Sequence, residues 1–191
     1  MERLRIVSAA SLFDGHDVSI NIMRRLLQSK GVEVIHLGHN RSAKEVVDAA
    51  ISEDAHAICL SSYQGGHVEY FTYVKDLLLE QGAKNIRVFG GGGGVITPKE
   101  IELLEERGIT KIYSPADGMK LGLDGIIDDI VEKSKHSTTN EFNWSGISKR
   151  KDLNSVELSK VISFIENNGK APFDVSNQGE TPILGITGTG G

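Results

Sequence analysis

Apolar and polar residues follow two different periods along the first 133 positions of the chain. Five short stretches are rich in apolar residues, and the third of them, residues 55–61, is almost continuously apolar, as is typical of a strand that is covered on both faces of a sheet. Between them, apolar residues recur every three or four positions, which indicates amphipathic helices. Strands are expected at residues 4–9, 32–37, 55–61, 86–89 and 111–113. Helices are expected at residues 18–30, 67–81 and 119–133, and two more begin near residues 42 and 97.

Capping boxes mark those two additional helix starts. Ser42 is followed three positions later by Glu45, and Thr97 is followed by Glu100. Pro98 stands at the first helical position, where its missing N–H costs no hydrogen bond. Five strands that alternate with helices predict an α/β fold with a doubly wound, flavodoxin-like parallel sheet in the order 2-1-3-4-5.

The pattern changes after residue 133. Residues 134–148 are polar and show no periodicity, which is typical of a linker. Apolar residues at helical spacing return near 155–167, and they predict one amphipathic helix. We therefore expect a first domain at residues 1–133 and a linker with one helix at residues 134–180.

Composition limits the class of protein without identifying it. The 191 residues carry a formal net charge of −5 and 39% hydrophobic residues, enough for one core of ordinary size plus a tail. A mildly acidic surface argues against general nucleic-acid binding. Cys59 is the single cysteine and lies in an apolar strand, so we expect a reduced, unreactive thiol in a cytoplasmic protein. There is no signal peptide, and no apolar run is long enough to span a membrane.

Candidate chemistry follows four of the predicted strands, at residues 14–16, 61–66, 90–94 and 114–118. The carboxyl ends of parallel strands share one edge of a doubly wound sheet, where such folds bind ligands. His16 offers a ring nitrogen to a metal, and Asp14 can hold the proton of the other ring nitrogen. Gly15 between them permits a tight turn or the close approach of a ligand. His36 and His56 lack metal-ligand spacing and are expected to be structural.

Five consecutive glycines, at residues 90–94, follow the fourth strand. A flexible linker is the simplest explanation of such a run. The run lies, however, between a strand and a capped helix, where connections are normally short. A wall of bare backbone there suits a flat aromatic group that lies against it.

The spacing of these loops resembles the cobalamin-binding signature. The Asp-Gly-His run at 14–16 is followed by two residues and Ser19, then 41 residues (20–60), then Ser-Ser-Tyr at 61–63, then 26 residues (64–89), then Gly90 and Gly91. The signature has glycine where Ser19 stands and leucine where Tyr63 stands. Serine is small enough to keep a close approach, whereas tyrosine is expected to reshape the pocket. The resemblance covers roughly the first 130 residues, which makes residues 1–133 a cobalamin-binding domain.

The resemblance implies that His16 replaces the cofactor's own benzimidazole as the lower ligand to cobalt, with Asp14 as its partner. The displaced nucleotide tail then enters a pocket beside the sheet. Implied cofactor-binding residues are Asp14, Gly15, His16, Ser19, Ser61, Tyr63, Gly90, Gly91, Gly92, Tyr113 and Pro115. Ser61 would hydrogen-bond the tail, while Tyr113 lies either at the pocket or in the core. His67 follows two glycines as in acyl-CoA mutases, which places it either near the corrin or at a helix start.

The last stretch is similar to the beginning of a phosphate-binding loop. Residues 182–187 resemble a strand, and Gly188, Thr189, Gly190 and Gly191 supply part of the glycine-rich motif, without its lysine. This order of segments is similar to that of the fused isobutyryl-CoA mutases. The resemblance makes residues 181–191 the start of a truncated GTPase domain in a longer protein.

The same resemblance implies an adenosylcobalamin-dependent isomerase that rearranges isobutyryl-CoA to n-butyryl-CoA. It further implies GTP and Mg²⁺ in a downstream chaperone domain, acyl-CoA bound by a downstream barrel, and a homodimer. Two alternatives stay open. Asp14, His16, Asp17 and Asn21 also resemble methionine synthase, which favours a corrinoid module for methyl transfer, and a non-catalytic cobalamin sensor would show the same loops. The Gly-Thr-Gly-Gly ending favours the mutase.

Overall fold

The computed structural model describes residues 3–16, 18–140, 142–147 and 152–173. The strands are β1 (Arg5–Ser11), β2 (Glu33–Arg41), β3 (Ala57–Ser61), β4 (Arg87–Gly91) and β5 (Lys111–Tyr113). The helices are α1 (Val18–Ser29), α2 (Ala43–Ser52), α3 (His67–Glu80), the 3-10 turn η1 (Gly93–Val95), α4 (Pro98–Glu106), α5 (Pro115–Ser134) and α6 (Ser155–Asn168).

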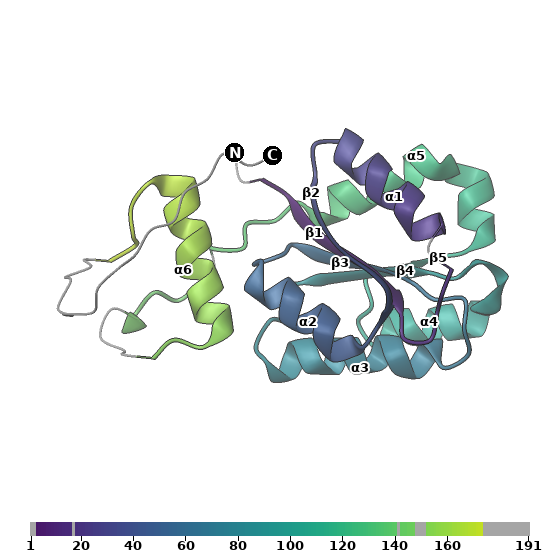
Figure 1. Ribbon diagram of the computed structural model, residues 1–191, viewed down its shortest axis with the longest axis horizontal. Helices are drawn as coiled ribbons and strands as arrows, with labels where there is room; N and C mark the ends of the chain where they lie inside the picture. Colours follow the sequence, from purple (N-terminus) through teal and green to yellow (C-terminus); the bar gives the residue numbers. More distant parts are fainter. Residues whose placement is uncertain (1–2, 17, 141, 148–151, 174–191) are drawn as a thin grey trace.

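All five strands are parallel and follow the order β2-β1-β3-β4-β5, which confirms the predicted flavodoxin-like sheet. Figure 1 shows α1 and α5 on one face of this sheet and α2, α3 and α4 on the other. Both predicted capping boxes are formed, at Ser42 and at Thr97. The carboxyl ends of β1, β3, β4 and β5 therefore meet at one edge of the sheet, as the predicted site requires.

Each face of the sheet has its own core. Val7 belongs to the cluster that packs on α2, α3 and α4, whereas its neighbour Ile6 belongs to the cluster under α1 and α5. Both side chains are fully buried, because successive residues of a strand point to opposite faces. This double burial explains the continuous apolar runs from which the strands were predicted.

Two boundaries differ from the prediction by four residues, and the other boundaries differ by two residues or fewer. β2 continues to Arg41, with register shifts against β1 that a simple apolar pattern does not reveal. The last predicted helix begins earlier, at Pro115, because Ser114 forms a capping box with Asp117. Gly122 then interrupts α5 with a left-handed φ of 66° and ψ of 174°, so the helix consists of two segments that meet at a kink.

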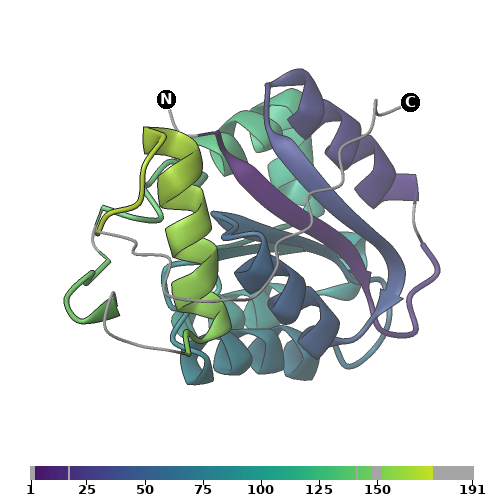
Figure 2. The same cartoon turned by 60° about the vertical axis from the view of Figure 1, so that its left-hand side comes forward.

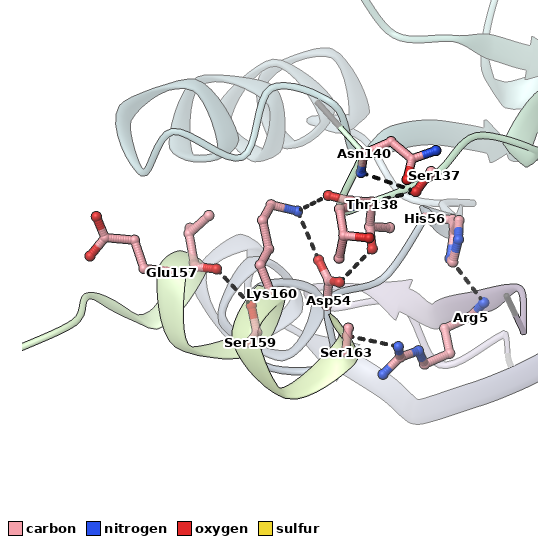
Figure 3. Close-up of polar contacts among 12 residues, drawn as sticks. Arg5, Asp54, His56, Ser137, Thr138, Asn140, Glu157, Ser159, Lys160 and Ser163 are labelled. Carbon is pink, nitrogen blue, oxygen red and sulfur yellow. Dashed lines mark hydrogen bonds and ion pairs between the residues drawn. The ribbon is translucent and has the colours of Figure 1, made fainter. Parts of the chain in front are cut away.

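The segment predicted as a linker is tied to the sheet domain. Figures 1 and 2 show α6 standing beside the end of the sheet where β1 begins, and α6 contacts α2. Buried Asp54 accepts hydrogen bonds from Thr138 Oγ1 at 2.5 Å and Lys160 Nζ at 2.9 Å, and Arg5 Nη2 donates to Ser163 Oγ at 2.8 Å (Figure 3). The helix predicted at 155–167 is thus present. The polar segment before it was predicted as a linker, but it forms specific hydrogen bonds with the sheet domain and with α6.

Other boundaries stay predictions. The division at residue 133 is one of them, and the strand and partial phosphate loop predicted at 182–191 lie outside the described residues. None of the helices within the described ranges combines the length and the apolar character needed to cross a bilayer.

Candidate functional site

Asp14 organises the loop after β1. It is fully buried, and its Oδ1 accepts a hydrogen bond from the His16 backbone N–H at 2.9 Å and lies 2.8 Å from His16 Nδ1. Its Oδ2 accepts a third bond, from the Tyr63 backbone N–H at 2.6 Å. One carboxylate therefore fixes the histidine and joins the loops that follow β1 and β3.

These contacts favour an ionised Asp14 and fix the tautomer of a neutral His16 ring. Burial alone would raise the pKa of Asp14, but the hydrogen bonds from Tyr63 and His16 hold that pKa below its ordinary value of 3.8. The ionised carboxylate can only accept, so the proton between the two groups resides on Nδ1 of His16. The lone pair of the imidazole is then on Nε2. The His16 side chain is 64% exposed, and no described residue forms a hydrogen bond to Nε2, so the geometry suits a metal ligand.

Beside this loop lies a cleft of about 270 Å³, between the carboxyl edge of the sheet, α1 and α5. Its lining is mostly apolar and includes the predicted residues Ser19, Ser61, Tyr63, Gly90, Gly91, Gly92, Tyr113 and Pro115. Asp14, Gly15 and His16 do not line it. They stand next to it, because the His16 ring lies 5.4 Å from the Tyr63 ring, centroid to centroid.

Ser61 is the buried polar group that most favours a ligand in this cleft. The residue is 6% exposed, and its hydroxyl has no hydrogen-bond partner among the described residues. An unsatisfied buried hydroxyl costs roughly 1–3 kcal/mol, which a polar group of a bound molecule would recover. The predicted role of Ser61 fits this position.

The glycine run has a different physical basis from the one expected. A Cβ on Gly92 would lie 1.8 Å from the Ser62 carbonyl oxygen, and a Cβ on Gly90 would lie 2.4 Å from the Phe71 ring. A side chain at Gly92 would thus meet the Ser62 backbone instead of projecting into the cleft. These glycines let β4 and the turn after it pack against their neighbours, and the bare wall of the cleft is a consequence of that packing.

Tyr113 serves both of the roles considered for it. It is 9% exposed, stacks on Phe89 with ring centroids 6.5 Å apart, and donates from its hydroxyl to Asp129 Oδ2 at 2.7 Å. Its ring also lines the cleft, next to Pro115 at the start of α5. It is thus a core residue whose free surface forms part of the pocket.

Several lining residues were not singled out from the sequence. These are apolar residues on the inner sides of α1 and α5, namely Ile20, Met23, Leu27, Leu123, Ile126 and Ile130. Their only sequence signal is the helical apolar stripe, which is the same for a residue that fills a core and for one that faces a cleft.

His36, His56, His67 and Cys59 occupy structural positions. His36 Nδ1 lies 2.9 Å from Ser8 Oγ, and His56 Nδ1 accepts from the Arg5 backbone N–H at 3.2 Å, which confirms the interpretation of both. His67 is the first residue of α3, and its Nε2 lies 3.3 Å from Glu100 Oε2, so the helix-start alternative describes its position. Burial raises the pKa of the Cys59 thiol to about 12, as expected for an unreactive cysteine.

Comparison with known proteins supplies the family. The model of the B12 binding domain matches residues 4–119. A fused isobutyryl-CoA mutase of Cupriavidus metallidurans is 51% identical over 195 residues, which cover 99% of this chain and 18% of that protein. Another, from Paraburkholderia xenovorans, is 65% identical over 131 residues, which cover 69% of this chain and 10% of that protein. This chain thus spans a small part of the curated relatives it matches.

A solved structure agrees with the fold. The crystal structure of a cobalamin-binding protein from Desulfitobacterium hafniense superposes with a TM-score of 0.58 at 21% identity, covering 71% of this chain and 60% of that one. The geometry of the Asp-His loop and of the cleft is consistent with the match to the B12 binding domain. The chain belongs to the B12-binding domain family.

Proposed function

We propose that this chain binds adenosylcobalamin with His16 Nε2 as the lower ligand to cobalt and with the nucleotide tail in the cleft. The observation that carries the proposal is the geometry of His16. Its Nδ1 is held by an ionised carboxylate, its Nε2 is exposed, and an apolar cleft opens beside it. A neutral imidazole is a good ligand for cobalt, and its hydrogen-bonded partner increases its basicity.

Each part of the site has a distinct task in this proposal. Asp14 fixes the tautomer and direction of the imidazole. Ser61 offers its unpaired hydroxyl to a polar atom of the tail, and the apolar walls from α1 and α5 exclude water from the benzimidazole. The bound cofactor supplies radical chemistry through homolysis of its cobalt–carbon bond, while the chain supplies ligation and orientation.

The whole protein is proposed to be an acyl-CoA mutase that converts isobutyryl-CoA to n-butyryl-CoA in the cytoplasm. The support is the similarity to fused isobutyryl-CoA mutases over nearly all of this chain. The proposal includes an acyl-CoA-binding barrel and a GTP- and Mg²⁺-dependent chaperone domain downstream, in a homodimer. A methyl-transfer module or a sensor would use the same cofactor site, so the presence of the proposed downstream barrel and GTPase domain is what would distinguish the mutase from these classes.

The ligand assignment is tested by paramagnetic resonance of the cob(II)alamin complex. Nitrogen-15 labelling of histidine is expected to change the hyperfine splitting in the wild type, and His16→Ala is expected to remove that signal. His39→Ala is the matched control, because His39 is an exposed histidine on β2 that does not line the cleft. A wild-type spectrum insensitive to the label, or a His16→Ala spectrum with the same splitting, would contradict the proposal.

A further inference from the structure

The two residues that depart from the cobalamin-binding signature contact one another. Ser19 lies in the first turn of α1, and Tyr63 follows the end of β3. The Ser19 hydroxyl donates to the Tyr63 hydroxyl oxygen at 3.1 Å, and both residues are half-buried and line the cleft. A glycine and a leucine at these positions could form no such bond. The two departures are therefore one structural feature, a bridge from α1 to the β3 loop.

Tyr63 is also connected to the metal-ligand loop. Its backbone N–H donates to Asp14 Oδ2 at 2.6 Å, and its ring lies 5.4 Å from the His16 ring at an interplanar angle of 42°. On another side its ring packs on Gly93, where a Cβ would lie 3.0 Å from Tyr63 Cε1. A movement of the Tyr63 side chain thus changes contacts both in the cleft and beside the His16 imidazole.

We propose that the Ser19–Tyr63 hydrogen bond is a latch that bridges the cleft in the free protein and opens to admit the nucleotide tail. Because the Tyr63 ring also lies beside the His16 ring, opening of the latch couples tail entry to ligation by His16. The inference rests on the proposed function, since it assigns these residues to the tail of the same cofactor. Tyr63 and Ser19 are positioning residues in this scheme, and neither bonds cobalt.

The latch makes a kinetic prediction. Tyr63→Phe keeps the ring and removes the hydroxyl, while Ser19→Ala removes the partner of that hydroxyl. Each variant is expected to bind adenosylcobalamin about fivefold faster, the factor that corresponds to the loss of one hydrogen bond of ordinary net strength. The double variant is expected to be no faster than either single variant, because both remove the same bond.

The measurement is stopped-flow absorbance of the conversion from base-on to histidine-bound adenosylcobalamin. Tyr73→Phe is the matched control, because Tyr73 is an exposed tyrosine on α3 outside the cleft. Adenosylcobinamide, which has no nucleotide tail, is the second probe, and its binding rate is expected to be equal in all variants.

The outcomes separate the latch from its alternatives. Unchanged or slower binding by Tyr63→Phe, additive effects in the double variant, or equal acceleration with adenosylcobinamide would each overturn it. If Tyr63→Phe binds the cofactor more weakly while the affinity of Ser19→Ala is unchanged, the phenol hydroxyl hydrogen-bonds the cofactor directly. Failure of the wild type to bind adenosylcobalamin with a histidine ligand would overturn the proposed function itself, and this is measured before any variant.

Discussion

At the scale of residues, the buried carboxylate of Asp14 connects most of the site. Asp14 takes hydrogen bonds from two backbone N–H groups and one imidazole, so that both of its oxygens are used. These bonds come from the loops after β1 and β3, which are far apart in the sequence. The residue that tunes the imidazole is therefore also one that holds the edge of the cleft together.

This double role gives a prediction for Asp14→Asn. Asparagine keeps the shape but replaces one acceptor by an N–H₂ group, which must face a backbone or imidazole N–H. We expect a loss of about 1–3 kcal/mol in the free energy of unfolding, because a buried donor is left unsatisfied. Cobalamin affinity should fall roughly 10–100-fold, as is typical when the partner of a metal ligand is lost. Urea unfolding and cobalamin titration measure the two effects, and unchanged affinity would contradict the role of Asp14 in ligation.

His16→Ala provides the contrast at the same scale. The side chain is largely exposed but donates one hydrogen bond to buried Asp14, so its removal should lower the free energy of unfolding by about 1 kcal/mol. A larger loss of stability with Asp14→Asn than with His16→Ala, together with a larger loss of cobalamin ligation with His16→Ala, would distinguish the structural task of the carboxylate from the chemical task proposed for the imidazole.

The turn after β4 shows at the scale of elements why glycine is required. Ser62 and Gly92 approach so closely that no side chain fits between the two backbones. Gly92→Ala is expected to lower the free energy of unfolding by about 3 kcal/mol, at the upper end of the cost of overpacking. Gly94→Ala is the matched control, because Gly94 is exposed and its Cβ would meet nothing within 4 Å. Equal stability of both variants in urea would show that close packing is not the reason for Gly92.

The docking of α6 depends on an ion pair that is largely removed from water. The side chains of Asp54 and Lys160 are 5% and 15% exposed, and their charged atoms lie 2.9 Å apart. Burial alone would raise the pKa of Asp54, but the charge of Lys160 and the hydrogen bond from Thr138 lower it below 3.8. The folded state therefore binds this proton less readily than the unfolded state, and the pair contributes stability above about pH 4.

Acid unfolding tests this ion pair. The contribution should be lost as the pH falls through the lowered pKa, so Asp54→Asn is expected to lose less stability than the wild type between pH 7 and about pH 3. At pH 7, Lys160→Ala should cost about 3–5 kcal/mol, because it leaves a buried charge without its partner. Asp48→Asn removes a more exposed carboxylate on α2 and serves as the control. An equal loss of stability in the wild type and in Asp54→Asn between pH 7 and about pH 3 would contradict the assignment.

At the scale of the whole molecule, the topology was predictable because the inner strands β1, β3 and β4 are buried on both faces and the helices pack on the sheet through one face. The loops that follow the strands then had to share an edge, which placed Asp14, Ser61 and Gly90 near one another. The contact between Ser19 and Tyr63 could not be predicted, since it depends on how α1 lies over the end of β3. The close approach of Gly92 to Ser62 could not be predicted from the sequence either. Nor could the docking of α6, because its partner Asp54 lies in the short connection before β3, where no periodic pattern marks it.

Different parts of the molecule lie at the two ends of the parallel strands. The cleft and His16 lie where the strands end, whereas Asp54, Arg5 and α6 lie where β1 and β3 begin. A strand of seven residues such as β1 spans about 23 Å, so these parts are separated by roughly the depth of the sheet. The docking of α6 and the cleft therefore occupy opposite ends of the sheet, so that a change at the Asp54–Lys160 pair is expected to leave the contacts between Asp14 and His16 in place.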